Sequence, residues 1–372
     1  MKIVIDCRAL DTHGGITAYL KECLPYFLDS PHDFLLFGNS RKISSIAHNR
    51  KNIEIVDCSI KPFSLRELLF FPVTIIKKIN ASDVLYLSYF NIPGNCCCKI
   101  RIPVFPTIHD VIFPDMPELT SKIGLWARMF FYRRAAHRAK AIFTVSEFSA
   151  SRIRHFLGKK TPIIVTYSAV PAYLRKDAEK KYAKTKTILF VGNIKKHKGL
   201  GILLEAFTKI KSIDKKNGLE YTLIIVGGRE NFRTSDTSLS RYFSECENGI
   251  VFTGAINENK LKKLYHEAAL LVQPSFYEGF GLPPLEAMTV GTKVLLSDIT
   301  VFKEIYADFP VTFFKTGDVA DLTEKLVQLL ITEKQKPPIL LSETLCEKYT
   351  FKKTAQVILS TILSHLTNYE KH

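Results

Sequence analysis

Short apolar runs alternate with helical patterns along a chain of 372 residues. In the first half the strand-like runs are KIVID, FLLFG, NIEIVD, DVLYLSY, IPVFPTIHD and AIFTVS, with helical sequence between several of them. The pattern begins again with TILFVG, YTLIIVGG, GIVFTG, LLVQPS and TKVLLSD. Strands that alternate with helices form βαβ units with parallel sheet. The sequence therefore predicts an α/β protein with two doubly wound, Rossmann-like domains.

A lysine-rich stretch without apolar periodicity, residues 171–187, is expected to be a linker between the two halves. The first domain is then expected over residues 1–170 and the second over residues 188–350. Residues 351–372 are expected to form a last helix that crosses back to the first domain. Two such domains facing each other would make a cleft, and ligands bind outside the carboxyl ends of the strands in sheets of this kind.

Composition and charge narrow the class of protein. Hydrophobic residues make up 46% of the chain and charged residues 24%, which is a globular balance. Only a short apolar run precedes Asp6, unlike a signal peptide, and no apolar run is long enough to span a bilayer. We therefore expect a cytoplasmic protein. The eight cysteines, three of them adjacent at 96–98, lack the spacing of a metal cage.

An excess of basic residues points to anionic partners. Lys and Arg outnumber Asp and Glu by 52 to 36, which gives a formal net charge of +16. Such a charge fits nucleic acid, an anionic membrane surface or phosphorylated substrates, and charge alone does not choose among them.

Two loops have the composition of phosphate sites. Gly14 and Gly15 follow the first strand and precede a helix, so the backbone could approach an anion there, although a tight turn without ligand is equally consistent. In VGNIKKHKGL, Lys195, Lys196 and Lys198 precede a helix that begins near residue 199. Lysines are unfavourable at a helix amino end unless an anion lies between them, the alternative being a solvated basic turn.

The stretch PSFYEGFGLPPLEAM, residues 274–288, places Glu278 and Glu286 on either side of a glycine-rich loop before a helix. Carboxylates accept hydrogen bonds from vicinal sugar hydroxyls, and free loop amides suit a diphosphate. The alternatives are a solvated carboxylate for Glu278 and a favourable interaction with the first helical turn for Glu286. The amides in question belong to Gly279, Phe280, Gly281 and Leu282.

In these residues the chain resembles the group 1 glycosyltransferases of the GT-B fold, the large retaining family often called family 4. The sequence EGFGLPPLEAM is similar to the E-x7-E element of that family, and VGNIKKHKG, LIIVGG, TIHD, TVSEFSASRI and the glycines after the first strand also fit. The resemblance covers nearly the whole chain. It implies an amino-terminal domain on the acceptor side and a carboxyl-terminal domain that binds the nucleotide-sugar.

The resemblance also implies roles for single residues. Glu278 would contact the transferred sugar and stabilise the charge that develops on it, Glu286 would bind the ribose, and Lys198 the diphosphate. His109 would reach the donor sugar across the cleft, with Asp110 orienting its ring. The loop amides of residues 279–282 would contact sugar and diphosphate, and the loop at Gly14 and Gly15 would close over phosphates and acceptor.

One position departs from the family pattern. An Arg usually stands five residues before the diphosphate-binding Lys, and this chain has Asn193, which cannot make a charged bidentate contact. Lys195 or Lys196 could supply the charge instead. A subset of the family with an asparagine-containing loop is associated with O-antigen mannosyl transfer.

The expected reaction is therefore a retaining transfer of a hexose, with mannose favoured, from a GDP- or UDP-linked sugar. The acceptor would be a lipid-linked oligosaccharide or polysaccharide of the bacterial surface. Because the leaving diphosphate would be bound by fixed positive charge and the chain has no Asp-x-Asp sequence, no metal or other cofactor is expected.

Residues 121–140 predict a helix with a core-facing stripe at Leu125, Met129, Tyr132, Ala136 and Ala139. Other faces carry aromatic and basic residues, which suits either packing against a neighbouring element or an anionic membrane interface. The membrane reading predicts a protein that is peripheral to the inner face of the cytoplasmic membrane. Residues 64–79 are a second candidate for a membrane-contacting segment. The residues concerned are Trp126, Phe130, Phe131, Arg133, Arg134 and Arg138.

Four other functions are compatible with parts of the sequence. A sugar-nucleotide epimerase or a phosphorylase could share the fold, but the E-x7-E element argues against the first and the chain length against a pyridoxal-type form of the second. A nucleic-acid-binding protein would need recognition motifs that this sequence lacks, so we expect no nucleic-acid partner. Asn193 is compatible with a catalytically inactive relative.

Overall fold

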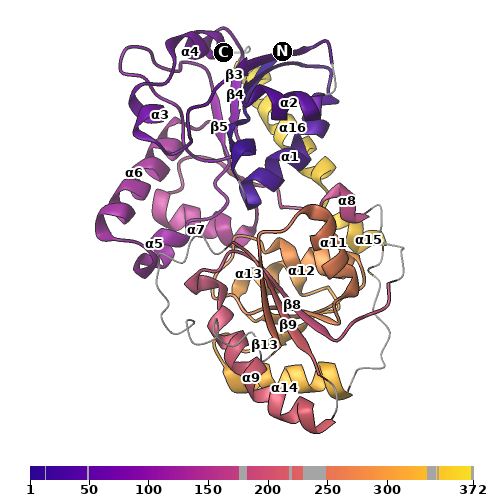
Figure 1. The fold of residues 1–372 in the computed structure, drawn as a ribbon. Coiled ribbons are helices and arrows are strands. Elements are labelled where there is room, and N and C mark those ends of the chain that lie inside the picture. The colour runs from indigo at the N-terminus through magenta and orange to yellow at the C-terminus, as the bar shows by residue number, and fades with distance from the viewer. Residues whose placement is uncertain are drawn as a thin grey trace. The chain divides into compact units, whose positions relative to one another are not determined.

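The computed structural model describes residues 1–12, 14–47, 50–175, 182–217, 220–228, 249–332, 341 and 343–369. The chain divides into two compact units (Figure 1). Unit 1 comprises Met1–Ser168 and Tyr349–His372, and unit 2 comprises Ala169–Lys348. The first division thus lies two positions before the expected end at residue 170. Residues 176–181 of the expected linker lie outside the described residues, and the rest of that segment belongs to unit 2.

Unit 1 is built on a sheet of parallel strands in the order β3-β2-β1-β4-β5. The order reverses between β1 and β4, which is the switch point where ligands bind in folds of this class. A short parallel pair, β6 and β7, continues from it through the bridge of Thr107 to Phe143. The strands are β1 (Lys2–Asp6), β2 (Asp33–Gly38), β3 (Ile53–Asp57), β4 (Val84–Leu87), β5 (Val104–Pro106), β6 (Ile142–Thr144) and β7 (Ile163–Val165).

Helices cover both faces of this sheet, with α1 and α16 on one side and α4 on the other (Figure 1). The carboxyl-terminal helix α16 packs against α1, so the two ends of the chain's sequence share one unit. The helices are α1 (Gly15–Leu28), α2 (Ser40–Ala47), α3 (Leu65–Leu69), α4 (Val73–Asn80), α5 (Ile112–Asp115), α6 (Lys122–Arg138), α7 (Glu147–Leu157) and α16 (Phe351–Tyr369).

Unit 2 repeats the architecture with strand order β10-β9-β8-β11-β12-β13, and its switch point lies between β8 and β11. The strands are β8 (Thr187–Val191), β9 (Thr222–Val226), β10 (Ile250–Gly254), β11 (Leu270–Gln273), β12 (Lys293–Ser297) and β13 (Thr312–Phe314). The helices are α8 (Ala172–Arg175), α9 (Leu200–Asn217), α11 (Glu258–Glu267), α12 (Leu282–Thr289), α13 (Thr300–Tyr306), α14 (Val319–Val327) and α15 (Glu343–Lys348).

The central strands are apolar and buried throughout, because helices cover them on both sides. In unit 2, α9 and α14 pack on one face of the sheet around Phe190, Leu203 and Leu322. The prediction of two doubly wound α/β domains is thus confirmed for each unit. The sequence reading missed β7 and β13, each of three residues, because such short runs do not stand out from apolar segments of loops.

Candidate active site

The strongest candidate site lies at the switch point of unit 2, where the loops after the neighbouring strands β8 and β11 meet. Lys198 comes from the first loop and Glu278 from the second. The Lys198 ammonium donates to both carboxylate oxygens of Glu278, at 2.7 Å each. Glu278 is 8% exposed, so the pair is largely withdrawn from water.

Close approach of the two backbones produces this pair. Gly199, which follows Lys198, has a φ of +66°, and a Cβ there would lie 1.9 Å from the carbonyl oxygen of Pro274. Only glycine fits such a contact, since the left-handed region and the space both exclude a side chain. The amide of Phe276 also donates to the carbonyl of His197, at 2.7 Å. The glycine therefore brings Lys198 within reach of Glu278.

Other donors hold the carboxylate of Glu278 independently of Lys198. Ser275 Oγ donates to its Oε1 at 2.8 Å, and Gln273 Nε2 lies 3.3 Å from the same atom. Ser275 and Gln273 are fully buried at the end of β11. Two of the three side-chain donors to Glu278 are therefore independent of Lys198.

His197 is a member of this site that sequence reasoning missed. Its side chain is buried, and burial lowers its pKa to about 4, with the nearby Lys198 as the next cause. The imidazole is therefore neutral at pH 7, and its Nδ1 makes no hydrogen bond within the described part of the chain. Its place within the lysine-rich loop was the only available signal.

Glu286 is buried beside Glu278's loop and accepts a hydrogen bond from the hydroxyl of Tyr265, at 2.6 Å to Oε2. Helix α12 begins at Leu282, so Glu286 lies past its first turn, and the first-turn explanation of this acid is wrong. Burial, and then the charge of Glu286, raise the pKa of Tyr265 well above its usual value. Tyr265 therefore remains a donor that orients the carboxylate; it belongs to α11 and was not predicted.

The loop between the two glutamates has a fixed shape. Gly281 has a φ of +83°, and a Cβ there would lie 2.4 Å from the ring of Phe302. The hydroxyl of Tyr306 donates to the carbonyl of Gly281. Phe280 is buried, whereas Gly279 and Leu282 are partly exposed. Pro283, directly after Leu282, lies in the first turn of α12.

The other predicted site residues of the loop after β8 are exposed to solvent. Asn193, Lys195 and Lys196 are exposed, and a 3-10 turn over residues 196–198 leads into α9, close to the helix start predicted near residue 199. Asn193 carries an uncharged amide, so it does not supply the positive charge of the Arg that is usual in the family at this position.

In unit 1 the glycine loop follows β1 as predicted. Gly14 has a φ of +122° and caps α1, which begins at Gly15. Both glycines are exposed, and a Cβ at either would meet no atom within 4 Å. Gly14 is thus required for its backbone conformation, while Gly15 leaves the amino end of α1 open.

His109 lies after β5 in unit 1 and is partly buried against the ring of Tyr19, with centroids 5.0 Å apart. Its Nε2 lies 2.9 Å from the carbonyl oxygen of Ser88. Burial lowers the pKa of His109, against the opposing effects of Ser88 and of Asp110. The Asp110 carboxylate accepts from the amide of Ile112 at 3.2 Å. The ring is therefore oriented by Ser88, and Asp110 affects it through charge.

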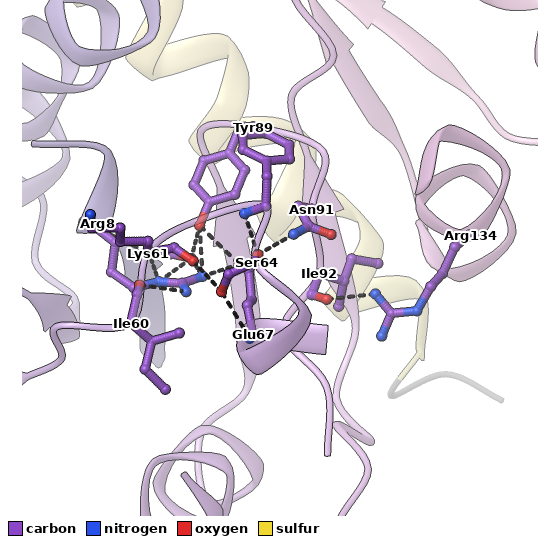
Figure 2. A network of polar contacts seen from close by, with 11 residues as sticks. Arg8, Ile60, Lys61, Ser64, Glu67, Tyr89, Asn91, Ile92 and Arg134 are labelled. Carbon is purple, nitrogen blue, oxygen red and sulfur yellow. Dashed lines mark hydrogen bonds and ion pairs between the residues drawn. The ribbon is translucent and has the colours of Figure 1, made fainter. Parts of the chain in front are cut away.

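A buried polar network that sequence reasoning missed fills the switch point of unit 1 (Figure 2). The Arg8 guanidinium contacts the carboxylates of Asp6 and Glu67, with Nη2 2.5 Å from an oxygen of each, and Tyr89 Oη lies 2.6 Å from that nitrogen. Asn91 Nδ2 also donates to Glu67. Burial raises the pKa of Glu67 to about 7. The only sequence signal was a pair of charges directly after the first strand.

Helix α6 differs in part from its prediction. Tyr132 and Ala136 are buried as expected, Ala135 joins them, and Leu125, Met129 and Ala139 are partly buried. Arg134 turns toward the protein and donates to the carbonyl of Ile92 at 2.5 Å. For Arg134 this contact favours packing against a neighbouring element over a membrane interface.

The exposed face of α6 is apolar at its centre. Ile123 is 81% and Trp126 71% exposed, and Phe130 stacks on Trp126 with centroids 6.3 Å apart. Phe131 is partly buried against Phe130, and Arg133 is exposed. Arg138 is exposed, and its guanidinium donates to the carbonyl of Ile100. No described helix combines the length and apolar character needed to cross a bilayer.

Comparison with known proteins places the chain in a family. The family model described as "Glycosyl transferases group 1" matches residues 174–338, and "Glycosyltransferase Family 4" matches residues 13–172. The O-antigen chain mannosyltransferase RfbU of Salmonella typhimurium is 32% identical over 203 residues, 54% of this chain and 53% of that protein. The O-antigen chain mannosyltransferase B of Escherichia coli is also 32% identical, over 218 residues. The match covers 54% of this chain and 55% of that protein. The chain thus spans about half the length of these curated relatives.

Solved structures share the fold over nearly the whole chain. Anabaena Alr3699/HepE, crystallised with UDP-glucose, has a TM-score of 0.68 at 16% identity and covers 98% of this chain and 100% of its own. A glycosyltransferase from Rickettsia africae has a TM-score of 0.67 at 14% identity, with 99% of each chain covered. Since the family models match both halves and the fold is GT-B, this chain belongs to the group 1, or family 4, glycosyltransferases.

Proposed function

We propose that this protein is a retaining glycosyltransferase that moves mannose from GDP-mannose to a lipid-linked or polysaccharide acceptor in bacterial O-antigen synthesis. The observation that carries the proposal is the contact of Lys198 with both oxygens of Glu278 at the switch point of unit 2. The Lys198 ammonium could bind a diphosphate, and the adjacent Glu278 carboxylate could bind sugar hydroxyls. The bond between sugar and phosphate would then break next to both groups.

Mannose is favoured because several curated relatives are O-antigen mannosyltransferases. The nucleotide itself is less constrained, since a structural neighbour was crystallised with UDP-glucose. Glu286, held by Tyr265, is suited to bind the two ribose hydroxyls of either nucleotide.

In the proposed reaction the bond from the sugar C1 to the diphosphate breaks, and its electron pair leaves with the diphosphate. Lys198 and the amides of residues 279–282 stabilise that charge, while Glu278 stabilises the positive charge on the sugar. The acceptor oxygen then bonds to C1 on the same face, and its proton passes to a diphosphate oxygen. Ser275 and Gln273 retain the Glu278 carboxylate when Lys198 turns to the diphosphate. From the family resemblance, we also expect His109 to contact the donor sugar during the reaction.

We propose that the reaction needs no metal ion, because the ammonium of Lys198 can supply the charge that a divalent ion supplies elsewhere. Turnover of GDP-mannose should then persist in EDTA. Loss of activity in EDTA with recovery in Mg²⁺ or Mn²⁺ would contradict this part of the proposal.

We further propose that the protein acts at the inner face of the cytoplasmic membrane, where a lipid-linked acceptor would be available. The exposed face of α6, with Ile123, Trp126 and Phe130 beside Arg133, supports this location. Apolar side chains flanked by cations suit an interface with anionic headgroups.

A thermal-shift comparison of GDP, UDP and their sugar conjugates tests the donor. A ligand that binds only the folded protein raises the melting temperature, by an amount that grows with concentration over its Kd. We expect the largest shift with GDP-mannose, followed by release of GDP when an acceptor is added. If no sugar nucleotide shifts the melting temperature, the proposed function is wrong.

A further inference from the structure

A basic groove of about 820 Å³ opens in unit 1, and Arg138 of α6 is one of its lining residues. The end of α4, the segment before β5 and the last turn of α6 form its walls. Its lining includes four cations and no acidic residue: Lys77, Lys99, Arg101 and Arg138.

Within the described part of the chain, no acidic side chain pairs with the exposed lysines and the arginine before β5 in this groove. Lys77, Lys99 and Arg101 are exposed, and their side chains form no ion pair with any described residue. The adjacent Lys78, by contrast, pairs with Glu54 at 2.6 Å. Gathering cations without an acid costs electrostatic energy, which a bound anion would relieve.

One further arginine, Arg134, adds positive charge beside the lining residue Arg138. Arg138 donates to the carbonyl of Ile100 at 2.5 Å, which fixes its guanidinium at the groove wall. Burial, and then the neighbouring Arg138, lower the pKa of Arg134. The two guanidinium groups thus repel each other, and the carboxylate of Glu67 offsets this effect on Arg134 only in part.

The side chain of Asn80 also binds the backbone around the groove. Asn80 Nδ2 donates to the carbonyl of Lys99 at 2.9 Å, and its Oδ1 accepts from the amide of Arg101 at 2.8 Å. Asn80 precedes β4 and Arg101 precedes β5, so the groove lies at the amino edge of the parallel sheet. His109 and Gly14 follow strands and belong to the opposite edge. The groove is therefore not a subsite of the candidate active site.

An exposed apolar patch borders the groove. The amide of Cys96, a groove residue, donates to the carbonyl of Leu69 at 3.2 Å, and Asn95 bridges to Phe70. Leu65 is 74% and Phe70 65% exposed, and Leu69 and Val73 are also exposed. We call Leu65, Leu69, Phe70 and Val73 the α3 patch. Cations beside a patch of this kind match the charge and polarity of an anionic lipid surface.

We propose that the basic groove binds the headgroup phosphate of an anionic phospholipid while the α3 patch enters the bilayer interface. This inference rests on the proposed membrane location and gives it a specific phosphate site. Phosphate fits the groove because Arg guanidinium and Lys ammonium groups are its usual partners in proteins. A membrane is favoured over other phosphate-bearing partners because the apolar patch has no counterpart in a nucleic-acid backbone.

Flotation of the full chain with phosphatidylglycerol vesicles tests the groove. The variant K77S/K99S/R101S removes three cations, and K159S/K160S/K260S removes three exposed lysines elsewhere as the matched control. A cation near an anionic bilayer contributes about fivefold to partitioning, so the groove variant should lose roughly 100-fold and the control far less. Equal loss in both variants, or equal binding to neutral phosphatidylcholine vesicles, would overturn the proposal.

A fluorophore locates the contact directly. Cys7, Cys23 and Cys58 are buried and Cys97 is exposed, so Cys97 can be labelled once Cys96, Cys98, Cys246 and Cys346 are changed to Ser. An environment-sensitive dye there should shift to shorter wavelength with phosphatidylglycerol vesicles and be quenched by brominated lipid. The variant L65S/F70S should weaken both signals, whereas V251S/V357S, at exposed valines elsewhere, should not. An unchanged dye spectrum on vesicles would place the contact elsewhere and overturn the proposal.

Competition distinguishes the source of the phosphate. Inorganic phosphate at millimolar concentration and a short DNA duplex are added to vesicle-bound protein. If the duplex binds more tightly than the vesicles and the groove variant loses that binding, a lipid occupant is wrong. Turnover of GDP-mannose measured without vesicles should be the same in the groove variant and wild type. Loss of vesicle binding is thus separable from failure of the proposed transferase function.

Discussion

Lys198 is the residue on which the proposed chemistry depends most. Replacing it in Lys198→Ala removes the cation that neutralises Glu278 and that would bind the leaving diphosphate. Loss of one such stabilising group typically lowers turnover by about 10²–10³-fold. We expect a loss of this size in kcat with GDP-mannose, and less than threefold for Lys196→Ala, whose side chain is exposed. Equal effects of the two variants would refute the assignment.

In the proposed function, Tyr265 orients Glu286 for binding of the ribose hydroxyls. Tyr265→Phe retains the buried ring and removes the hydroxyl that donates to Oε2. Hydrogen bonds to charged groups contribute about 1.5–3 kcal/mol, so we expect KM for the donor to rise at least tenfold with kcat nearly unchanged. Steady-state kinetics separates the two constants. A fall in kcat with constant KM would show that Glu286 acts on the reacting sugar instead.

His197 links stability to pH. Its folded-state pKa of about 4 lies below the unfolded value of about 6.5, so between these two pH values the unfolded chain binds more protons. The free energy of unfolding should therefore fall as pH drops from 6.5 to 4, by up to about 3 kcal/mol. Denaturant unfolding of His197→Gln should lack this component, while the same change at exposed His155 should retain it. A parallel pH profile for His197→Gln and wild type would contradict the prediction.

At the level of elements, the residues that sequence analysis identified are those that follow strands of a parallel sheet. Lys198 and Glu278 are 80 positions apart, yet strand order places their loops side by side. Tyr265 could not be found in this way, because which face of a helix meets a given carboxylate depends on tertiary packing. Arg8 and Glu67 likewise meet across 59 positions through a short helix that has no apolar period.

The network around Arg8 holds α3 against the switch point of unit 1. Glu67 also accepts from the amide of Phe63, a residue at φ 61°, so the network fixes a backbone conformation that is otherwise unfavourable. Arg8→Met would leave two buried carboxylates without a cation, and such changes cost about 3–5 kcal/mol. Chemical unfolding should show that loss. Arg50→Met, which breaks the surface pair with Asp29, should cost less than about 1 kcal/mol.

At the level of the whole molecule, unit 1 is made from two separate parts of the chain. Helix α16 returns to it, where Thr354 Oγ1 donates to the carbonyl of Thr166 at 2.9 Å and Phe351 contacts Tyr19. A chain that ends at Lys348 should therefore lose stability in unit 1 alone. Hydrogen exchange should become faster in β1 and β4 and stay slow in β8 and β11, because a shortened chain leaves unit 2 complete.

The same shortened chain separates folding of unit 1 from nucleotide binding by unit 2. Lys198, Glu278 and Glu286 all belong to unit 2, so GDP should still protect β8 and β11 from exchange. Removal of residues 370–372 alone serves as the control and should change neither unit. If β1 kept its full protection in the chain ending at Lys348, the stability of unit 1 would not depend on α16, and its packing against α1 would be energetically minor.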